Sequence, residues 1–148
     1  MKVSAKGRYA LAAVISMAQQ HNSGENVSII SISGKLGISK IYLEQVFSLL
    51  KRGGLVTSVK GAQGGYQLTR MPEQMSVLDV LSAVENSLFE KTEETVPNKA
   101  PAIEAAMYST VFDALDRIVR EILGDITLSD LLAEAERQKA DDALMFYI

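Results

Sequence analysis

The chain has 148 residues, 47% hydrophobic and 22% charged, a globular composition that excludes extensive disorder. It contains no Cys and one His, which excludes disulfides, Cys-bound zinc, Cys-ligated iron–sulfur clusters and multi-histidine metal sites. The net charge of −3 divides into +7 over residues 1–70 (nine basic, two acidic) and −10 over residues 71–148 (six basic, sixteen acidic). A basic N-terminal half can bind a polyanion while the acidic half favours solubility.

The first segment, residues 4–20, is rich in small residues and good helix formers, which predicts a helix. Its basic start and short apolar run are also found in signal peptides, but the run is Ala-rich and only weakly hydrophobic. No apolar run reaches the roughly 18 residues of a membrane span. We therefore expect the first helix of a cytoplasmic protein that does not bind membranes.

Two further helices are predicted before residue 55. Residues 28–36 form a short helix that Gly37 can end in a left-handed conformation, and Ser39 is a good N-cap for the next helix. That helix has an apolar stripe at positions i, i+3, i+4 and i+7, formed by Leu43, Val46, Phe47 and Leu50. Two helices joined by a tight glycine turn predict a helix-turn-helix.

A hairpin is predicted directly after this pair. Residues 55–59 and 66–69 have strand patterns, and the connecting loop 60–65 contains three glycines. A hairpin in this position is a wing, so we expect a mostly α fold with a small β-hairpin. The loop glycines would let the backbone approach a ligand or a phosphate closely.

The C-terminal half is predicted to be helical. Ser76 with Asp79 and Thr127 with Asp130 are capping boxes, and Pro101 suits the first turn of a long helix that Gly124 ends. The last helix is expected to end at about Arg137. The predicted organisation is a winged helix-turn-helix domain (1–86), an acidic loop (87–100), dimerisation helices (101–137) and a tail (138–148).

The third helix is the candidate DNA-reading element. Gln45 can bond to adenine, Glu44 can accept a hydrogen bond from cytosine N4, and Ile41 can pack on a thymine methyl group. Phosphate or base contacts near its N-terminus are expected for Ser39, Lys40 and Tyr42. Lys60 in the wing could enter a minor groove. An ordinary solvated helix and a loose hairpin are the alternatives, but a wing and a basic half together favour DNA binding.

The long helix carries an apolar stripe formed by Met107, Val111, Leu115, Ile118 and Ile122. The stripe could pack within one domain, but paired recognition helices need a two-fold partner, so we expect these residues to be buried in a homodimer interface. The sequence has no Ser/His/Asp set, no phosphate loop and no plausible acid–base pair, so no enzymatic activity is expected.

Three segments, SAKGRYAL, ISKIYLEQVFSLLKRGGLV and SVKGAQGGYQLTR, resemble the bacterial winged-helix family of the iron–sulfur regulator IscR and the nitric-oxide-sensing repressor NsrR. The resemblance implies a dimer crossed through the long helix. It implies contacts with double-stranded DNA at Lys2, Ser4, Lys6, Arg8, Ser39, Lys40, Ile41, Tyr42, Glu44, Gln45, Lys60 and Gly61.

Cluster-bearing members of this family place three cysteines in the loop that corresponds to residues 86–106, where this chain has neither Cys nor His. No cofactor is therefore expected. The start MKVSAKGRY and the end MFYI resemble the cluster-free branch of the cysteine-metabolism repressor CymR, which pairs with cysteine synthase (O-acetylserine sulfhydrylase). That resemblance implies a partner-binding tail formed by Met145, Phe146, Tyr147 and Ile148; alternatively, the tail covers the dimer core.

Three functions remain open at this point. The first is a dimeric repressor of cysteine and sulfur metabolism genes that cysteine synthase regulates through the tail. The second is a repressor that senses a small molecule or another stress signal. The third is a protein-interaction module that has kept the fold and lost DNA binding.

Overall fold

The computed structural model describes residues 1–147. Its elements are α1 (Ala5–Gln19), α2 (Ile29–Leu36), α3 (Lys40–Arg52), β1 (Val56–Val59), β2 (Gly65–Leu68), α4 (Val77–Val84), α5 (Pro101–Met107), α6 (Asp113–Asp125) and α7 (Leu128–Phe146). Short 3-10 turns lie at His21–Ser23 and Pro72–Gln74, and a π-helical turn, Tyr108–Phe112, joins α5 to α6. No helix within residues 1–147 has the length and apolar composition needed to cross a bilayer.

Serine side chains begin the first three helices. The hydroxyls of Ser4, Ser28 and Ser39 each accept a backbone N–H from the first turn of α1, α2 and α3. Helix α2 ends at Gly37, whose φ of 68° lies in the left-handed region. These boundaries confirm the predicted helices and the predicted glycine turn between α2 and α3.

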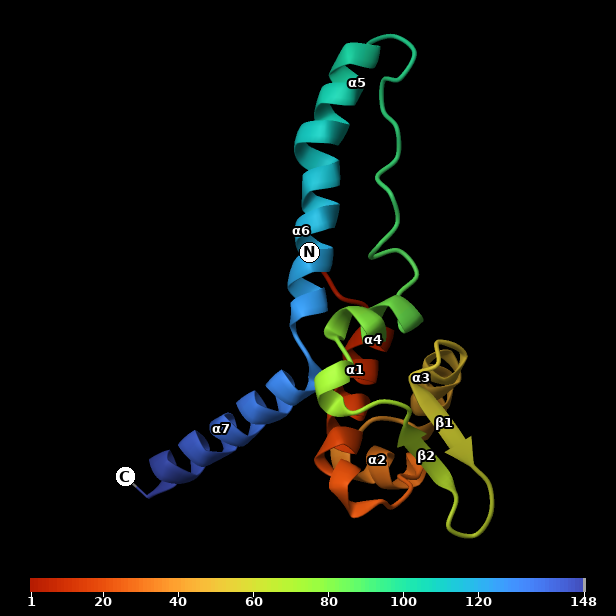
Figure 1. Cartoon of the computed structure of the whole chain (residues 1–148), viewed down its shortest axis with the longest axis vertical. Coiled ribbons are helices and arrows are strands. Elements are labelled where there is room, and N and C mark those ends of the chain that lie inside the picture. The colour runs from red at the N-terminus through yellow and green to blue at the C-terminus, as the bar shows by residue number, and fades with distance from the viewer. Residues whose placement is uncertain (148) are drawn as a thin grey trace.

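The hydrophobic core lies where α1, α3 and α4 pack together next to the hairpin (Figure 1). The predicted stripe of α3 is confirmed, because Leu43, Val46, Phe47 and Leu50 are all 0% exposed. The centroid of the Phe47 ring lies 4.7 Å from that of Tyr66 in β2, so this pair packs α3 against the hairpin.

Strands β1 and β2 are antiparallel, and Val59 pairs with Gly65 at the end of the hairpin. The backbone of Val27 adds to the sheet by exchanging two hydrogen bonds with Tyr66, at 2.8 and 2.9 Å. A Cβ at Gly65, whose φ is 152°, would lie 2.6 Å from the Val27 carbonyl oxygen, and one at Gly64 would lie 2.4 Å from that of Val59. The protein's own backbone therefore requires glycine at both positions, and the close approach of this loop to a ligand or a phosphate stays a prediction.

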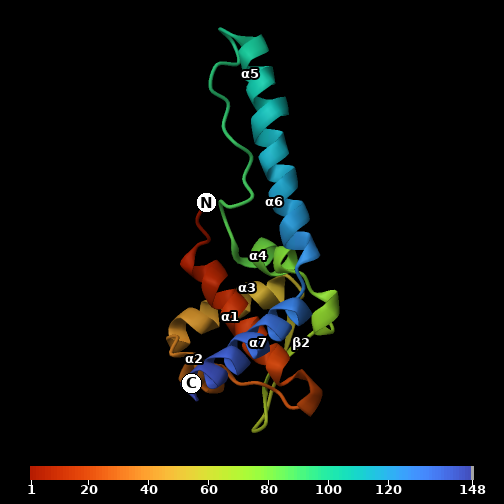
Figure 2. The same ribbon diagram turned by 90° about the vertical axis from the view of Figure 1, so that its left-hand side faces the viewer.

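Residues 101–125, which comprise α5, the π-helical turn and α6, form a long rod that projects from this domain (Figure 1). The loop 86–100 runs along the rod, and α5, the π-helical turn and α6 return to the domain beside α4 (Figures 1 and 2). Helix α7 then crosses beside α1. Two backbone hydrogen bonds fix the junction: Val77 donates to Ile126 at 2.8 Å and Leu128 donates to Met75 at 2.9 Å.

The capping boxes at Ser76 and Thr127 are confirmed, but two predictions for the C-terminal half are wrong. Helix α7 does not end near Arg137 but continues to Phe146, so residues 138–146 belong to a helix rather than to a separate tail. The chain has no Gly or Pro between Thr127 and Phe146, and Arg137 pairs with both Glu134 and Asp141 along one face. The predicted single long helix is also interrupted by the π-helical turn.

The apolar stripe of the rod is not covered by the chain itself. Val111, Leu115, Ile118 and Ile122 are 46, 55, 46 and 56% exposed, and Met107 is half-buried. The chain itself does not bury these residues, because the rod projects away from the core (Figure 1), and their burial in a homodimer stays a prediction. The alternative, that the stripe packs within one domain, is excluded on the same ground.

Candidate nucleic-acid interface

Opposite its buried stripe, helix α3 has an exposed face that carries both polar and apolar side chains. Ile41 is 70% and Tyr42 50% exposed, and Glu44 and Gln45 are also exposed. The Ser39 hydroxyl accepts the backbone N–H of Tyr42 at 3.3 Å and so fixes the first turn of this helix. The residues predicted to read base edges therefore lie together on one exposed face.

Helix α1 contributes to the same surface. A shallow groove of about 490 Å³ is lined by Lys6, Ile41, Glu44, Gln45, Ser48 and Leu49. Tyr9 of α1 packs edge-on against Tyr42, with 5.6 Å between the ring centroids. The structure thus places Lys6, which the family resemblance selected, beside the predicted base-reading residues of α3.

Glu44 is paired on this face in the free protein. The Lys40 ammonium lies 3.8 Å from the Glu44 carboxylate, and both side chains are more than half exposed, at 57 and 53%. An exposed ion pair of this kind contributes little and exchanges readily. Both groups are therefore available to exchange partners, Lys40 for a phosphate and Glu44 for a base amino group.

The N-terminal arm has a fixed geometry that the sequence did not predict. Glu85 Oε1 accepts hydrogen bonds from the Ser4 backbone N–H at 2.9 Å and from the Ser4 hydroxyl at 2.8 Å. A Cβ at Gly7 would lie 2.2 Å from the same oxygen, so glycine makes the contact possible. Lys2 and Arg8 are exposed beside this contact, whereas the Ser4 hydroxyl is already used by Glu85.

The wing carries the other predicted contacts. Lys60 and Gly61 are exposed in the hairpin loop, at the end away from the rod (Figure 1). Gly61 has a φ of 113° with open space around it, so it requires glycine for its backbone conformation alone. Lys51 at the end of α3 donates to the Ser58 hydroxyl of β1 at 2.8 Å and ties the helix to the hairpin.

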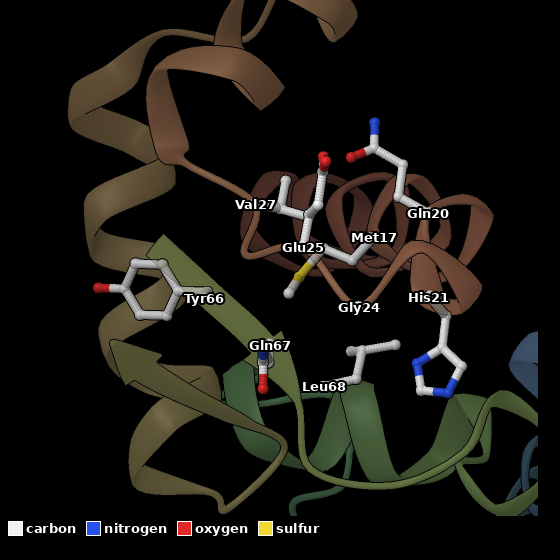
Figure 3. Close-up of a pocket in the computed structure, with 9 residues that line it drawn as sticks. All are labelled: Met17, Gln20, His21, Gly24, Glu25, Val27, Tyr66, Gln67 and Leu68. Atoms are coloured by element: carbon white, nitrogen blue, oxygen red, sulfur yellow. The ribbon is translucent and has the colours of Figure 1, made fainter. Parts of the chain in front are cut away.

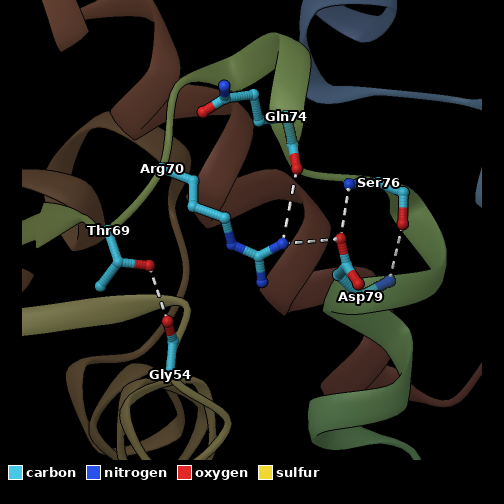
Figure 4. A network of polar contacts seen from close by, with 6 residues as sticks. All are labelled: Gly54, Thr69, Arg70, Gln74, Ser76 and Asp79. Carbon is cyan, nitrogen blue, oxygen red and sulfur yellow. Dashed lines mark hydrogen bonds and ion pairs between the residues drawn. The ribbon is translucent and has the colours of Figure 1, made fainter.

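The last basic residue of the N-terminal half has a structural role. Arg70 Nη1 lies 3.3 Å from Asp79 Oδ2 and 3.4 Å from the Gln74 carbonyl oxygen, while Asp79 also closes the capping box with Ser76 (Figure 4). Thr69 donates to the Gly54 carbonyl oxygen at 2.6 Å. These contacts anchor the base of the wing and leave Arg70 less free to bind DNA than Lys60.

A cavity of about 190 Å³ lies under the wing, between the end of α1 and β2 (Figure 3). Met17, Val27 and Leu68 form its apolar wall, and His21 stands at its edge with Nε2 3.1 Å from the Met71 sulfur. This cavity could not be predicted from the sequence, because its walls come from segments far apart in the chain.

The turn between α2 and α3, the exposed face of α3 and the hairpin after it define a winged helix-turn-helix transcriptional regulator. The chain belongs to the Rrf2 family, whose sequence model, described as "Iron-dependent Transcriptional regulator", matches residues 3–134.

The relatives are named as transcriptional regulators, not enzymes. The regulator CymR of Bacillus subtilis is 35% identical over 148 residues, which is all of both chains. IscR of Aliivibrio salmonicida is 35% identical over 142 residues, covering 96% of this chain and 83% of the relative.

Two solved structures have the same fold. The structure of B. subtilis CymR, described as the global cysteine regulator, has a TM-score of 0.74 and 32% identity over 90% of this chain and 98% of that one. T. potens IscR has a TM-score of 0.72 and 37% identity over 93% of this chain and 90% of that one.

The residues present do not fit an iron–sulfur cluster. The chain has no Cys, and its one His lies at the edge of the cavity under the wing rather than in the loop 86–106. Across residues 1–147, no three His, Cys, Asp or Glu side chains come together as a metal site. The described residues therefore provide no ligand set for the iron that the family description names.

Proposed function

We propose that this regulator is a repressor that binds a two-fold symmetric operator as a homodimer, with α3 in the major groove and the wing on the backbone or in the minor groove. The observation that carries the proposal is the groove in which Lys6 lies beside Ile41, Glu44 and Gln45. Specific DNA binding requires two kinds of group side by side: a cation that contacts phosphates, and side chains that can bond to base edges. A protein-interaction module that had lost DNA binding would have no need to keep this combination of side chains.

The proposed dimer interface is the rod. In its apolar stripe, more than half of the surface of Leu115 and of Ile122 is exposed to solvent. Large exposed apolar patches mark interaction sites. A second rod would cover the same stripe on both chains, as a two-fold interface requires. Two recognition helices would then read half-sites about 34 Å apart, or a multiple of that distance.

The proposed targets are genes of cysteine and sulfur metabolism. Support comes from the similarity to CymR along the whole of both chains and from the description of its structure as a global cysteine regulator. The absence of Cys and His from the loop 86–106 also favours the cluster-free branch.

We further propose that the end of α7 docks in cysteine synthase. Leu144, Met145, Phe146 and Tyr147 are between 63 and 87% exposed and do not pack on the core of their own chain. Ile148, which the prediction also includes, lies outside the described residues. An apolar end that is held on a helix suits insertion into a pocket of a partner.

The DNA proposal is tested with two variants whose expected effects differ in kind. Gln45→Ala should cost about 1–3 kcal/mol and relax the preference at one base position. Lys60→Ala should weaken binding to all sequences and lower the dependence of log K on log[salt] by about one unit. Lys139→Ala, an exposed lysine of α7, is the control that should change neither.

Fluorescence anisotropy with operator duplexes at several salt concentrations measures both effects. The operator itself comes from a genomic binding map. If Gln45→Ala and Lys60→Ala bound the operator as the parent does, the assignment of α3 and the wing would be wrong.

The docking proposal is tested by calorimetry with cysteine synthase, using the intact chain and a chain lacking residues 145–148. We expect the deletion to abolish the complex and to leave the dimer folded, and O-acetylserine to compete with the tail. Equal affinity for the two chains would assign the end of α7 to structure. A loss of dimer stability on deletion would do the same.

A further inference from the structure

A second cavity lies away from the DNA surface, between the loop 86–100 and the start of the rod. It has a volume of about 230 Å³, and Lys91, Glu94, Pro97, Pro101, Glu104 and Tyr108 are among the residues that line it. The loop and the rod together line an open depression that holds charges of both signs beside two proline rings.

Glu104 is the unusual residue of this cavity. It is only 7% exposed, although carboxylates are rarely buried unless they are paired. Its Oε1 accepts backbone N–H groups of Thr95 at 2.5 Å and Val96 at 3.3 Å, which fixes the loop on the rod. Its Oε2 is also buried, and no donor within residues 1–147 reaches it. A buried carboxylate oxygen without a donor is costly, so a missing cationic partner is the simplest account.

The other groups in the cavity indicate what kind of cation it accepts. Burial, and then the nearby negative charges of Glu104 and Glu94, raise the pKa of the Tyr108 hydroxyl. The two carboxylates in the lining favour a positively charged group beside them. The Tyr108 hydroxyl donates to the Thr92 carbonyl oxygen and is therefore occupied. The Lys91 ammonium lies 5.1 Å from the centre of the Tyr108 ring and places one positive charge opposite the acids.

A metal ion does not suit this arrangement. Two carboxylates line the cavity, and across residues 1–147 no group of three His, Cys, Asp or Glu side chains comes together. A ligand with one ammonium and one carboxylate instead matches both Glu104 and Lys91 and would leave a small apolar side chain against the proline rings.

We propose that this cavity binds a small α-amino acid, whose ammonium donates to Glu104 Oε2 and whose carboxylate pairs with Lys91. The ligand would bridge the loop and the rod at the point where the π-helical turn begins. The proposal does not depend on DNA binding or on the cysteine synthase complex, so its test uses binding to the protein alone.

The test is a titration of the full-length, ¹⁵N-labelled protein, followed by its amide resonances. Glycine, L-alanine, L-serine and L-valine are the amino-acid probes. Propionate and ethylamine are the matched controls, because propionate is alanine without its ammonium group and ethylamine is alanine without its carboxylate group. We expect saturable shifts confined to residues 91–108 with at least one amino acid, weaker binding of ethylamine and no binding of propionate.

Variants assign the two charges separately. Glu104→Gln keeps an oxygen for the Thr95 and Val96 N–H groups but loses the charge, and it should weaken amino-acid binding at least about tenfold, the equivalent of one charge-assisted hydrogen bond. Lys91→Gln should reduce the affinity for the amino acid to that for ethylamine. Glu90→Gln, on the same loop but exposed and outside the cavity lining, should bind as the parent does.

Circular dichroism establishes that each variant is folded, and Lys91→Gln decides the matter if Glu104→Gln is not. The proposal is overturned if none of the four amino acids shifts residues 91–108, or if Glu104→Gln and Lys91→Gln, both folded, bind them as tightly as the parent.

Discussion

The N-terminal domain buries its apolar side chains within one chain, whereas the rod leaves its apolar side chains exposed. In the domain, α1, α3, α4 and the hairpin enclose a core in which Leu43, Val46, Phe47 and Leu50 are completely buried. In the rod, α6 has a strongly one-sided apolar pattern but no buried residue within the described chain. The contacts of one chain therefore bury the apolar residues of the domain, whereas they leave the stripe of the rod uncovered, where the proposed dimer would cover it. The predictions below test this contrast.

Disrupting the rod stripe should have the largest effect. Ile118→Asp would place an unpaired charge twice in a two-fold interface, at about 3–5 kcal/mol for each buried charge. We expect a monomer in sedimentation equilibrium at concentrations where the parent is a dimer, with the DNA-binding domain still folded. Arg117→Gln, which removes only an exposed ion pair with Glu121, should remain a dimer. A parent that is already monomeric at micromolar concentration would refute the proposed interface.

A matched pair of leucines sharpens the contrast. Leu50→Ala removes a fully buried side chain and should lower the free energy of unfolding by about 2–5 kcal/mol. Leu115→Ala, at 55% exposure, should cost far less when it is measured in the monomeric Ile118→Asp background. Urea unfolding gives both values, and equal losses would mean that the rod has a core of its own.

The wing should respond to glycine substitution according to its internal contacts. Gly65→Ala places a Cβ at a φ of 152° and within 2.6 Å of the Val27 carbonyl oxygen, so we expect a loss of about 1–3 kcal/mol. Gly61→Ala has only the strained φ of 113° and open space, and it should cost less. Thermal unfolding compares the two, and a larger loss for Gly61→Ala would contradict the proposed reason for Gly65.

The smallest effect is expected on α7. The Arg137 guanidinium and then the Gln138 amide donate to Glu134 and lower the pKa of its carboxyl from 4.5 to about 2. A lowered pKa stabilises the folded state above pH 4.5, and this contribution is lost as the pH falls towards 2. Because about half of the Glu134 side chain is in contact with solvent, which screens its charge, Glu134→Gln should lower the melting temperature only slightly at pH 7. That difference should disappear near pH 2; a difference that persists there would show that the charge is not its cause.

Local patterns made the DNA-binding domain predictable. The serine caps, the glycine after α2 and the spacing of the α3 stripe each depend on residues within a few positions of one another. The exposed face that holds Ile41, Glu44 and Gln45 follows from the same helical spacing. The prediction of this part of the candidate site therefore needed no knowledge of distant contacts.

Distant contacts account for what the sequence did not indicate. The bond between Ser4 and Glu85 joins residues 81 positions apart, and the need for glycine at position 65 depends on Val27 in another segment. The buried carboxylate of Glu104 depends on how the loop folds back along the rod. The length of α7 was underestimated because its apolar pattern weakens after Leu132, although its helix-forming residues and ion pairs continue.

The π-helical turn at Tyr108–Phe112 determines how α5 is rotated relative to α6 about the axis of the rod. Each residue of an α-helix advances the chain by about 100° around its axis, and a π-helical turn accommodates one residue more than an α-turn does. That extra residue fixes the rotation of α5, which carries Glu104 and part of the cavity lining, relative to the stripe of α6. We therefore expect a change in the length of this turn to be tolerated less well than a change in the identity of its residues. Deleting one of them would rotate the cavity about a quarter turn away from its present side of the rod, whereas conservative substitutions would leave the two faces aligned.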